Sequence, residues 1–215
     1  MRTKTLFLAA ALVAAGIFSS KAQNVYSQNT VGYVNTVSVG GTFNLIANPL
    51  DDGTNTVVDL FGSAPNQTEV EVWNGSSYTL SKKIAGNWTT NLLLYPGTGF
   101  FLEYPVSAGT VTNTFVGNVV VQQPDGVQLG TNTTALPGSF VLDGSVFPIS
   151  DTLTGATMNL GSVLANASEV ETWNGSSFTL AKKIAGNWNT NLTLSVGQGF
   201  FIDSKNATNW VEILP

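Results

Sequence analysis

The stretch TEVEVWNGSSYTLSKKIAGNWTTN at residues 68–91 occurs a second time, as SEVETWNGSSFTLAKKIAGNWNTN at residues 168–191. The two stretches match at 19 of 24 positions with a constant offset of 100. Identity of this extent within one chain indicates an internal duplication, in which each copy forms one structural unit. The similarity continues downstream, from GTGFFL at residues 97–102 to GQGFFI at residues 197–202.

The pattern around the duplicated stretch is that of β-strands. Short runs rich in Val, Ile, Thr, Tyr, Phe and Trp are broken about every 8–12 residues by Asn-Gly, Asp-Gly, Pro-Gly or Gly-Asn pairs. This spacing predicts an all-β protein of two tandem antiparallel β-sandwich-like repeats, with at most short helical turns. We place the first unit at residues 23–122 and the second at residues 123–215. Because no flexible linker separates the units, we expect them to pack together.

One helical turn per unit is compatible with this pattern. At residues 56–61, Thr56 can cap the turn and Asp59 follows three residues later. We expect the corresponding turn of the second unit at residues 157–160.

The Asn74-Gly75 pair predicts the tip of a β-hairpin. A two-residue loop would mix carboxylates with apolar side chains on one face, whereas a three-residue loop at residues 73–75 separates the two kinds. The side chains expected to point inward are those of Val70, Val72, Tyr78, Leu80 and Ile84. Those expected to point outward are those of Glu69, Glu71, Ser77, Thr79, Ser81 and Lys83. Trp73 and its repeat Trp173 are then expected at exposed loop tips.

The first 22 residues have the pattern of a targeting segment. A basic start with Arg2 and Lys4 precedes a short apolar run, and Ser20-Lys21-Ala22 offers small residues at the two positions that a signal peptidase reads. We expect a secretory signal peptide at residues 1–22 that is cut after Ala22. The mature protein is expected outside the cytoplasm, secreted or at the cell surface, with the periplasm as the alternative.

Composition excludes several classes of chemistry. The chain has no His and no Cys, so no His-dependent or Cys-dependent nucleophile, His-ligated metal or disulfide is available. Its net charge is −5, and loss of the targeting segment with its three cations would make it −8. Nucleic acid is therefore an unsuitable partner, because phosphate binding needs clustered cations. No other segment has the roughly 20 apolar residues of a membrane helix, so we expect no membrane insertion after cleavage.

Two acidic motifs suggest chemistry that we do not favour. The pairs Glu69/Glu71 and Glu169/Glu171 have the separation of glycosidase carboxylates, about 5–10 Å, but they also suit an ordinary solvated strand. Asp51 and Asp52 could offer oxygens to Ca²⁺, although the spaced ligands of an EF-hand are missing. We expect no catalytic residues, no metal site and no cofactor.

The repeated tryptophans are the strongest candidates for binding. Trp73 and Trp173, each followed by an asparagine at Asn74 and Asn174, are expected at loop tips, where an aromatic ring can stack on a sugar. The other repeated pair, Trp88 and Trp188, is expected in the core, because small units without disulfides need large apolar side chains.

Three segments of the first unit form an ordered pattern: GTFNLIANP at residues 41–49, VWNG at residues 72–75 and LYPGTGFFL at residues 94–102. This pattern resembles a poorly characterised family of secreted bacterial β-repeat modules. The second unit keeps WNG and GQGFFI, but it replaces Asn-Leu-Ile with Val141-Leu142-Asp143 and the proline with Val196. The resemblance implies one β module in two copies and an association with exported proteins, and it brings no catalytic or ligand residues.

We therefore predict a non-enzymatic secreted or cell-surface protein with a structural, self-assembly or adhesion role, such as a component of a surface layer, matrix or filament. Its expected partners are other copies of itself or other cell-surface and matrix components. Strand-like segments at residues 29–39 and 209–214 offer edges for such pairing. The alternative is a carbohydrate-binding module that uses Trp73 and Trp173 to bind glycans, and a carboxylate-dependent glycoside hydrolase is the third hypothesis.

Overall fold

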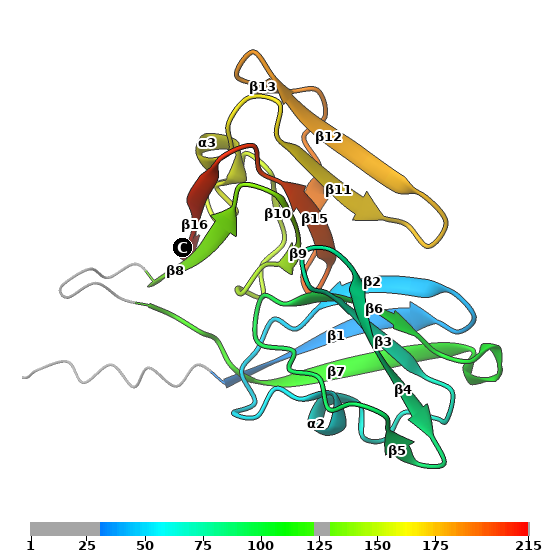
Figure 1. Ribbon diagram of the computed structural model, residues 1–215. Coiled ribbons are helices and arrows are strands. Elements are labelled where there is room, and N and C mark those ends of the chain that lie inside the picture. Colours follow the sequence, from blue (N-terminus) through cyan, green and yellow to red (C-terminus); the bar gives the residue numbers. More distant parts are fainter. Residues whose placement is uncertain (1–30, 123–129, 215) are drawn as a thin grey trace, which may run out of the picture.

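The computed structural model describes residues 31–122 and 130–214 of the chain (Figure 1). Over these residues the protein is all-β, with only short helices, as predicted. The expected signal peptide at residues 1–22 and residues 123–129, where the expected second unit begins, lie outside the described residues.

The first set of strands, called unit 1, consists of two antiparallel sheets. The first strand and the last strand form a two-stranded ribbon, and the other five form a sheet in the order β2-β6-β3-β4-β5. The strands are β1 (Val31–Val39), β2 (Phe43–Ala47), β3 (Glu69–Trp73), β4 (Tyr78–Ile84), β5 (Asn87–Trp88), β6 (Gly99–Glu103) and β7 (Thr110–Asn118). Helix α2 (Val57–Phe61) and the 3-10 turn η1 (Val106–Ala108) connect them.

The second set of strands, called unit 2, repeats this topology. The ribbon is β8-β16, and the five-stranded sheet has the equivalent order β9-β15-β11-β12-β13. The strands are β8 (Gly130–Pro137), β9 (Phe140–Gly144), β11 (Glu169–Trp173), β12 (Phe178–Ile184), β13 (Asn187–Trp188), β15 (Gly199–Asp203) and β16 (Ala207–Leu214). Two further short strands, β10 (Asp151–Thr152) and β14 (Thr193–Leu194), pair with each other, and α3 (Leu160–Val163) is the helical turn. The predicted pair of repeated β units is confirmed.

Each unit buries its own apolar core between ribbon and sheet. In unit 1 the ribbon supplies Val34 and Phe115, and the sheet supplies Val70, Phe100 and Leu102. In unit 2 the largest buried side chain is that of Trp210, whose ring centroid lies 5.9 Å from that of Phe200. The sandwich-like arrangement follows from the alternation of buried and exposed residues along each ribbon strand.

The predicted helical turn of unit 1 is confirmed. Thr56 is the N-cap of α2, and its hydroxyl oxygen accepts a hydrogen bond from the backbone N–H of Asp59 at 3.3 Å. In unit 2 the turn begins later than predicted: α3 starts at Leu160, after Asn159 in a left-handed conformation.

The predicted loop of the first hairpin is wrong. Trp73 lies opposite Tyr78, so the loop has four residues, 74–77, rather than three. The side chain of Asn74 sets this length: its Oδ1 accepts hydrogen bonds from the backbone N–H groups of Ser76 and Ser77, at 3.1 and 2.9 Å. The loop begins one residue later and is one residue longer than predicted, so the register of β4 is shifted by three residues: Val70 lies opposite Ser81 rather than Tyr78.

The register shift exchanges the two faces of β4. Tyr78, Leu80 and Ile84, predicted to point inward, are 41%, 45% and 49% exposed, whereas Ser81 and Lys83, predicted to point outward, are buried. Both buried polar groups have partners. The Ser81 hydroxyl donates to the carbonyl of Thr90, and the Lys83 ammonium donates to the carbonyl of Gly62 at the end of α2, both at 2.5 Å.

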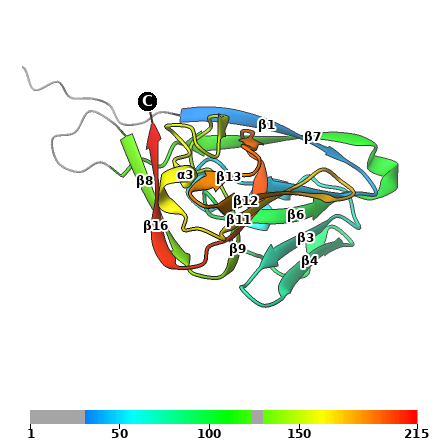
Figure 2. The same ribbon diagram turned by 90° about the horizontal axis from the view of Figure 1, so that it is seen from above.

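The two units pack together through one face of each five-stranded sheet (Figures 1 and 2). The buried centre of this interface contains Leu45 and Phe101 from unit 1 and Leu142 and Phe201 from unit 2. The ring centroids of Phe101 and Phe201 lie 6.3 Å apart. The predicted packing of the units is therefore present, and it uses residues that are repeated between them.

The edge strands of the two sheets also cover each other. The backbone N–H of Ala47, on β2, donates to the carbonyl of Gly197 at 2.9 Å. In return the N–H of Gly144, on β9, donates to the carbonyl of Gly97 at 2.8 Å. The repeated Gly-x-Gly segments thus cap the edge strand of the opposite unit, which protects edges that would otherwise be open to pairing.

Candidate functional site

Trp73 and Trp173 lie in the interface between the units. The indole N–H of Trp73 donates to the carbonyl of Phe140 at 3.2 Å, and that of Trp173 donates to the carbonyl of Phe43 at 2.8 Å. Each tryptophan therefore binds the first residue of the opposite unit's edge strand. Both rings also pack against the buried cluster at the centre of the interface.

The expected exposure of these two tryptophans is wrong. Both are half-buried, because the four-residue loop leaves Trp73 within β3 and Trp173 within β11, on the sheet face that meets the other unit. Sugar binding through them remains a prediction. It would have to use the part of each ring that the interface leaves open.

Asn74 and Asn174 stabilise the loops of their hairpins. The Oδ1 of Asn174 accepts from the N–H groups of Ser176 and Ser177, at 3.0 and 2.9 Å, and its Nδ2 donates to the Ser177 hydroxyl at 3.0 Å. Asn74 makes the same contacts in its own hairpin. Both side-chain amides stabilise their turns. Their hydrogen-bonding groups already have partners within the protein.

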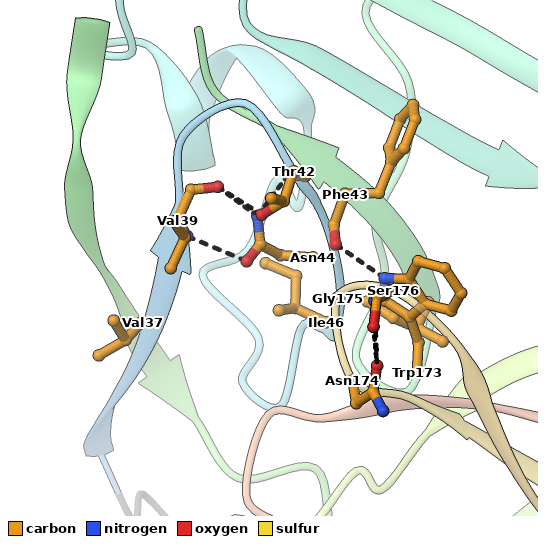
Figure 3. Close-up of a pocket in the computed structure, with 11 residues that line it drawn as sticks. Val37, Val39, Thr42, Phe43, Asn44, Ile46, Trp173, Asn174, Gly175 and Ser176 are labelled. Carbon is orange, nitrogen blue, oxygen red and sulfur yellow. Dashed lines mark hydrogen bonds between the residues drawn. The ribbon is translucent and has the colours of Figure 1, made fainter. Parts of the chain in front are cut away.

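A surface pocket of about 450 Å³ lies beside Trp173 (Figure 3). One wall comes from β1 and β2 of unit 1, and the other comes from the hairpin tip of unit 2. Its lining includes Val37, Val39, Ile46, Trp173 and Gly175. The pocket walls therefore belong to both units, and this part of the surface depends on their packing.

The Asn44 side chain in this pocket is satisfied within the protein. The Asn44 side chain accepts from the N–H of Val39 at 3.0 Å and donates to the carbonyls of Val39 and Thr42, at 3.1 and 2.8 Å (Figure 3). It thereby closes the turn between β1 and β2. The pocket offers a partner both polar and apolar surface next to a strand edge.

We expect Trp73→Phe and Trp173→Phe each to lower the free energy of unfolding by about 0.5–1.5 kcal/mol, because each removes a hydrogen bond between units. The measurement is urea denaturation followed by tryptophan fluorescence and circular dichroism. Trp188→Phe is the matched control, since the indole N–H of Trp188 is buried without a partner among the described residues. A loss at Trp188 equal to those at the interface would contradict the role given to the hydrogen bonds.

Trp88 and Trp188 pack against the cores of their own units, as predicted, although both remain partly exposed. They follow the Lys-Lys doublets of the duplicated stretch and form short strands opposite Lys83 and Lys183. Their role is therefore local to each unit.

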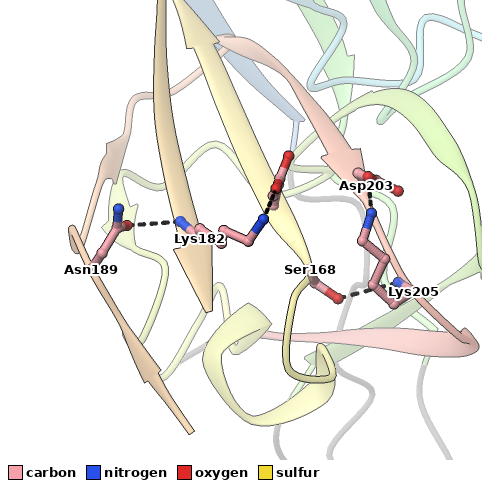
Figure 4. Close-up of polar contacts among 6 residues, drawn as sticks. Ser168, Lys182, Asn189, Asp203 and Lys205 are labelled. Atoms are coloured by element: carbon pink, nitrogen blue, oxygen red, sulfur yellow. Dashed lines mark hydrogen bonds and ion pairs between the residues drawn. The ribbon is translucent and has the colours of Figure 1, made fainter. Parts of the chain in front are cut away.

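The repeated glutamates take part in ion pairs on the sheet. Lys182 contacts Glu169 at 2.5 Å (Figure 4), and Lys82 contacts Glu69 at the same distance. Lys183, by contrast, donates to the carbonyls of Gly161 and Leu164, both at 2.7 Å. The first lysine of each doublet thus pairs with a carboxylate, and the second binds the carbonyls around a helical turn.

Glu71 and Glu171 have altered acidity. Partial burial raises the pKa of both carboxyls, and the charges of Glu69 and Glu103 add to the effect at Glu71. At Glu171 the further contributions come from Glu169 and Asp203. A raised pKa suits a proton donor, but the same shift follows from acidic neighbours on a half-buried sheet.

The Asp51-Asp52 segment forms a hydrogen-bonded turn. Asp51 Oδ1 accepts from the N–H of Gly53 at 2.9 Å and from Asn55 Nδ2 at 2.6 Å. Asp52 Oδ1 accepts from the N–H groups of Thr54 and Asn55, at 2.9 and 2.5 Å. Within residues 31–122 and 130–214, no group of three or more acidic side chains is arranged to hold a metal ion.

Sequence reasoning missed two neighbouring acids, the half-buried Asp143 and the buried Glu212. Glu212 is completely buried, and its carboxylate accepts hydrogen bonds from the Ser145 hydroxyl and from the N–H of Val146, the latter at 3.2 Å. Burial raises the pKa of Glu212 to about 7, the two hydrogen bonds oppose the shift and the charge of Asp143 adds to it. Burial also raises the pKa of Asp143 to about 7.

One signal could have found Asp143. It occupies the place of Ile46 in the repeat, since Asp143 lies opposite Phe200 as Ile46 lies opposite Phe100. A carboxylate at a position that is buried and apolar in the other copy indicates a group with a raised pKa. Glu212 lies in β16, a strand outside the strongly duplicated stretch, so it has no comparable signal.

In the part of the chain that the structure describes, no helix is both long and apolar enough to cross a membrane. Comparisons with protein-family models, curated proteins and solved structures gave no match for the chain. What the structure supports is thus a tandem pair of similar antiparallel β units whose repeated residues hold the pair together.

Proposed function

We propose that the protein is a non-enzymatic component of a secreted or cell-surface structure, with a role in self-assembly or adhesion. The observation that supports this most is the use of the repeated residues. Trp73, Trp173, Gly97 and Gly197 make contacts between units. The duplicated residues therefore serve association between modules.

The surface chemistry is consistent with such a role. Large apolar side chains are exposed at equivalent places on the two units: Tyr78, Leu80 and Ile84 on β4, and Phe178, Leu180 and Ile184 on β12. Tyr78 and Phe178 each contact the aromatic cluster of the interface, with ring centroids 5.8 Å from Phe101 and Phe201 respectively. Exposed apolar side chains gathered along one strand are common on surfaces that bind other macromolecules.

Sedimentation velocity and negative-stain microscopy of the protein without residues 1–22 test this proposal. We expect association that increases with concentration, or retention on cell-surface or matrix preparations. A protein that stays monomeric at every concentration and binds neither preparation would remove the proposal.

Carbohydrate binding through Trp73 and Trp173 is the second candidate. A glycan array should then show binding that is lost in Trp73→Ala/Trp173→Ala. Because both tryptophans also hold the units together, circular dichroism must show that the variant is folded. The glycosidase hypothesis has weaker support, since Glu69 and Glu169 are engaged by lysines.

A further inference from the structure

Strand β1 has an outer edge, here called its free edge, that no described strand pairs with. Among the described residues it pairs only with β7, in a two-stranded ribbon. The N–H of Val39 donates to Asn44 Oδ1, and its carbonyl accepts from Thr42 and Asn44, so these backbone groups point away from β7. Backbone groups of alternate residues in an antiparallel strand point the same way. Those of Tyr33, Asn35 and Val37 therefore face the free edge, and no described residue pairs with them.

The residues along this edge favour pairing. Strands β1 and β7 contain no charged residue. Tyr33 is 73% exposed and Val37 is 63% exposed, and Val116, opposite Tyr33, is 56% exposed. Soluble proteins usually protect long edge strands with lysine, proline or bulges. None of these interrupts residues 31–39.

The corresponding strand of unit 2 shows how such an edge is occupied. β8 is the first strand of its unit and pairs with the last strand, as β1 does. Its outer edge is bound by the chain that leaves unit 1: Gln122 N–H donates to the carbonyl of Thr131 at 2.6 Å, and Thr131 N–H donates back at 3.3 Å. The fold therefore accepts backbone pairing at this position, here as a single β-bridge.

The other terminal strand does not offer an equivalent edge. The expected pairing segment at residues 209–214 lies in β16, which pairs with β8 on one side. On its other side, Ile213 N–H donates to the carbonyl of Thr157 at 3.1 Å, and Asn159 Nδ2 donates to the carbonyl of Val211 at 3.3 Å. Of the two segments expected to pair with neighbours, β1 is the one whose outer edge has no strand partner within residues 31–122 and 130–214.

We propose that a second copy of the protein pairs with this edge through its own β1, antiparallel and around a twofold axis near Asn35. The partner is thus another copy of the same chain, which presents the same uncharged edge. The chain is acidic, with a net charge of −5, and two acidic copies repel least where neither carries charge. The pocket beside Val37 and Val39 gives the added strand room next to the hairpin tip of unit 2 (Figure 3).

This inference rests on the proposed self-assembly and names the surface that carries it. Pairing would join two ribbons into one four-stranded sheet in the order β7-β1-β1-β7. Twofold pairing by identical edges is a common way to form dimers. The exposed apolar stripes on β4 and β12 would remain free in such a dimer.

A cysteine scan tests the geometry, because the natural chain has no cysteine and any disulfide must join two copies. We expect Asn35→Cys to form a covalent dimer under mild oxidation, since paired residues at the axis have Cα atoms about 5.5 Å apart. Thr114→Cys is the matched control: it is also exposed and lies directly opposite Asn35, but on β7, away from the edge. Cross-linking at Thr114 equal to that at Asn35 would overturn the proposal.

A second pair of variants tests the hydrogen bonds. Val37→Pro removes one N–H from the free edge and leaves the ladder to β7 intact, whereas Val37→Thr keeps the N–H and a β-branched side chain. We expect Val37→Pro to raise the dissociation constant of the dimer about tenfold or more, and Val37→Thr to leave it nearly unchanged. Thermal unfolding checks that both variants are folded.

The outcomes separate this inference from the proposed function. Pairing through β1 would be overturned if Val37→Pro associates as strongly as the wild type and Asn35→Cys cross-links no more than Thr114→Cys. Self-assembly would then have to use another surface. A wild-type protein that stays monomeric would overturn pairing through β1, and the proposed function would then depend on the binding to matrix preparations alone.

Discussion

Gly144→Ala is expected to lower the free energy of unfolding by about 1–3 kcal/mol, the usual cost of overpacking. A Cβ atom built on Gly144 lies 2.1 Å from the Cβ of Ala47 in the other unit. Gly144 cannot simply move away, because its N–H donates to the carbonyl of Gly97 at 2.8 Å. The midpoint temperature should fall by about 2–4 °C for each kcal/mol lost, as measured by calorimetry.

The double variant Ala47→Gly/Gly144→Ala gives this prediction a specific control. It moves the methyl group from one side of the contact to the other, so it should recover most of the lost stability. Gly32→Ala is a second control: its Cβ would meet only Leu50, at 3.9 Å, and its stability should stay near that of the wild type. If the double variant is no more stable than Gly144→Ala, the contact between units is not the cause.

The fold class could be predicted because its signals are local. Alternating apolar residues, turn pairs and a Thr56 cap act over a few residues, and the structure contains the strands and the helical turn that they indicate. The duplication indicated two similar units, and the absence of a linker indicated that they pack.

The register of the hairpin could not be predicted from the alternation of apolar and polar residues, because this alternation fixes a register only where one face of the sheet is apolar and the other is solvated. In the structure the ribbon covers one face of the sheet, and the other unit covers the opposite face over β2, β3 and β6. Buried polar groups then become acceptable where carbonyls are nearby, as at Ser81 and Lys83. The alternation of apolar residues along β4 therefore predicted the wrong set of inward-pointing side chains.

The exposure of Trp73 and Trp173 was predicted wrongly for a related reason. A repeated aromatic residue beside a turn suggests a ligand platform when each unit is considered alone. Trp73 and Trp173 have their partners in the opposite unit, 67 and 130 residues away in the sequence. No local pattern encodes such a contact.

Glu212→Gln is expected to stabilise the protein by about 3 kcal/mol at pH 8 and to leave its stability at pH 4 nearly unchanged. Burial raises the pKa of Glu212 to about 7 from an ordinary value of 4.5. The folded protein therefore holds this proton up to about pH 7, whereas the unfolded chain releases it near pH 4.5. Stability consequently falls as the pH rises between these values and changes little above them.

Asp143 contributes in the same direction, because burial raises its pKa to about 7 and its charge acts on Glu212. The two carboxyls therefore titrate as a pair. Urea denaturation at several values between pH 4 and pH 8 measures the profile, which should be steepest in the wild type, flatter in Glu212→Gln and Asp143→Asn, and flattest in the double variant.

Glu69→Gln is the matched control for this profile. It removes a carboxylate that Lys82 engages at 2.5 Å on the partly exposed sheet face, so it should cost up to about 1 kcal/mol at pH 8 rather than stabilise. Because the chain has no histidine, a slope between pH 5 and pH 7 must come from perturbed carboxyls such as these. A slope that survives in the Glu212→Gln/Asp143→Asn variant would show that these two carboxyls are not its source.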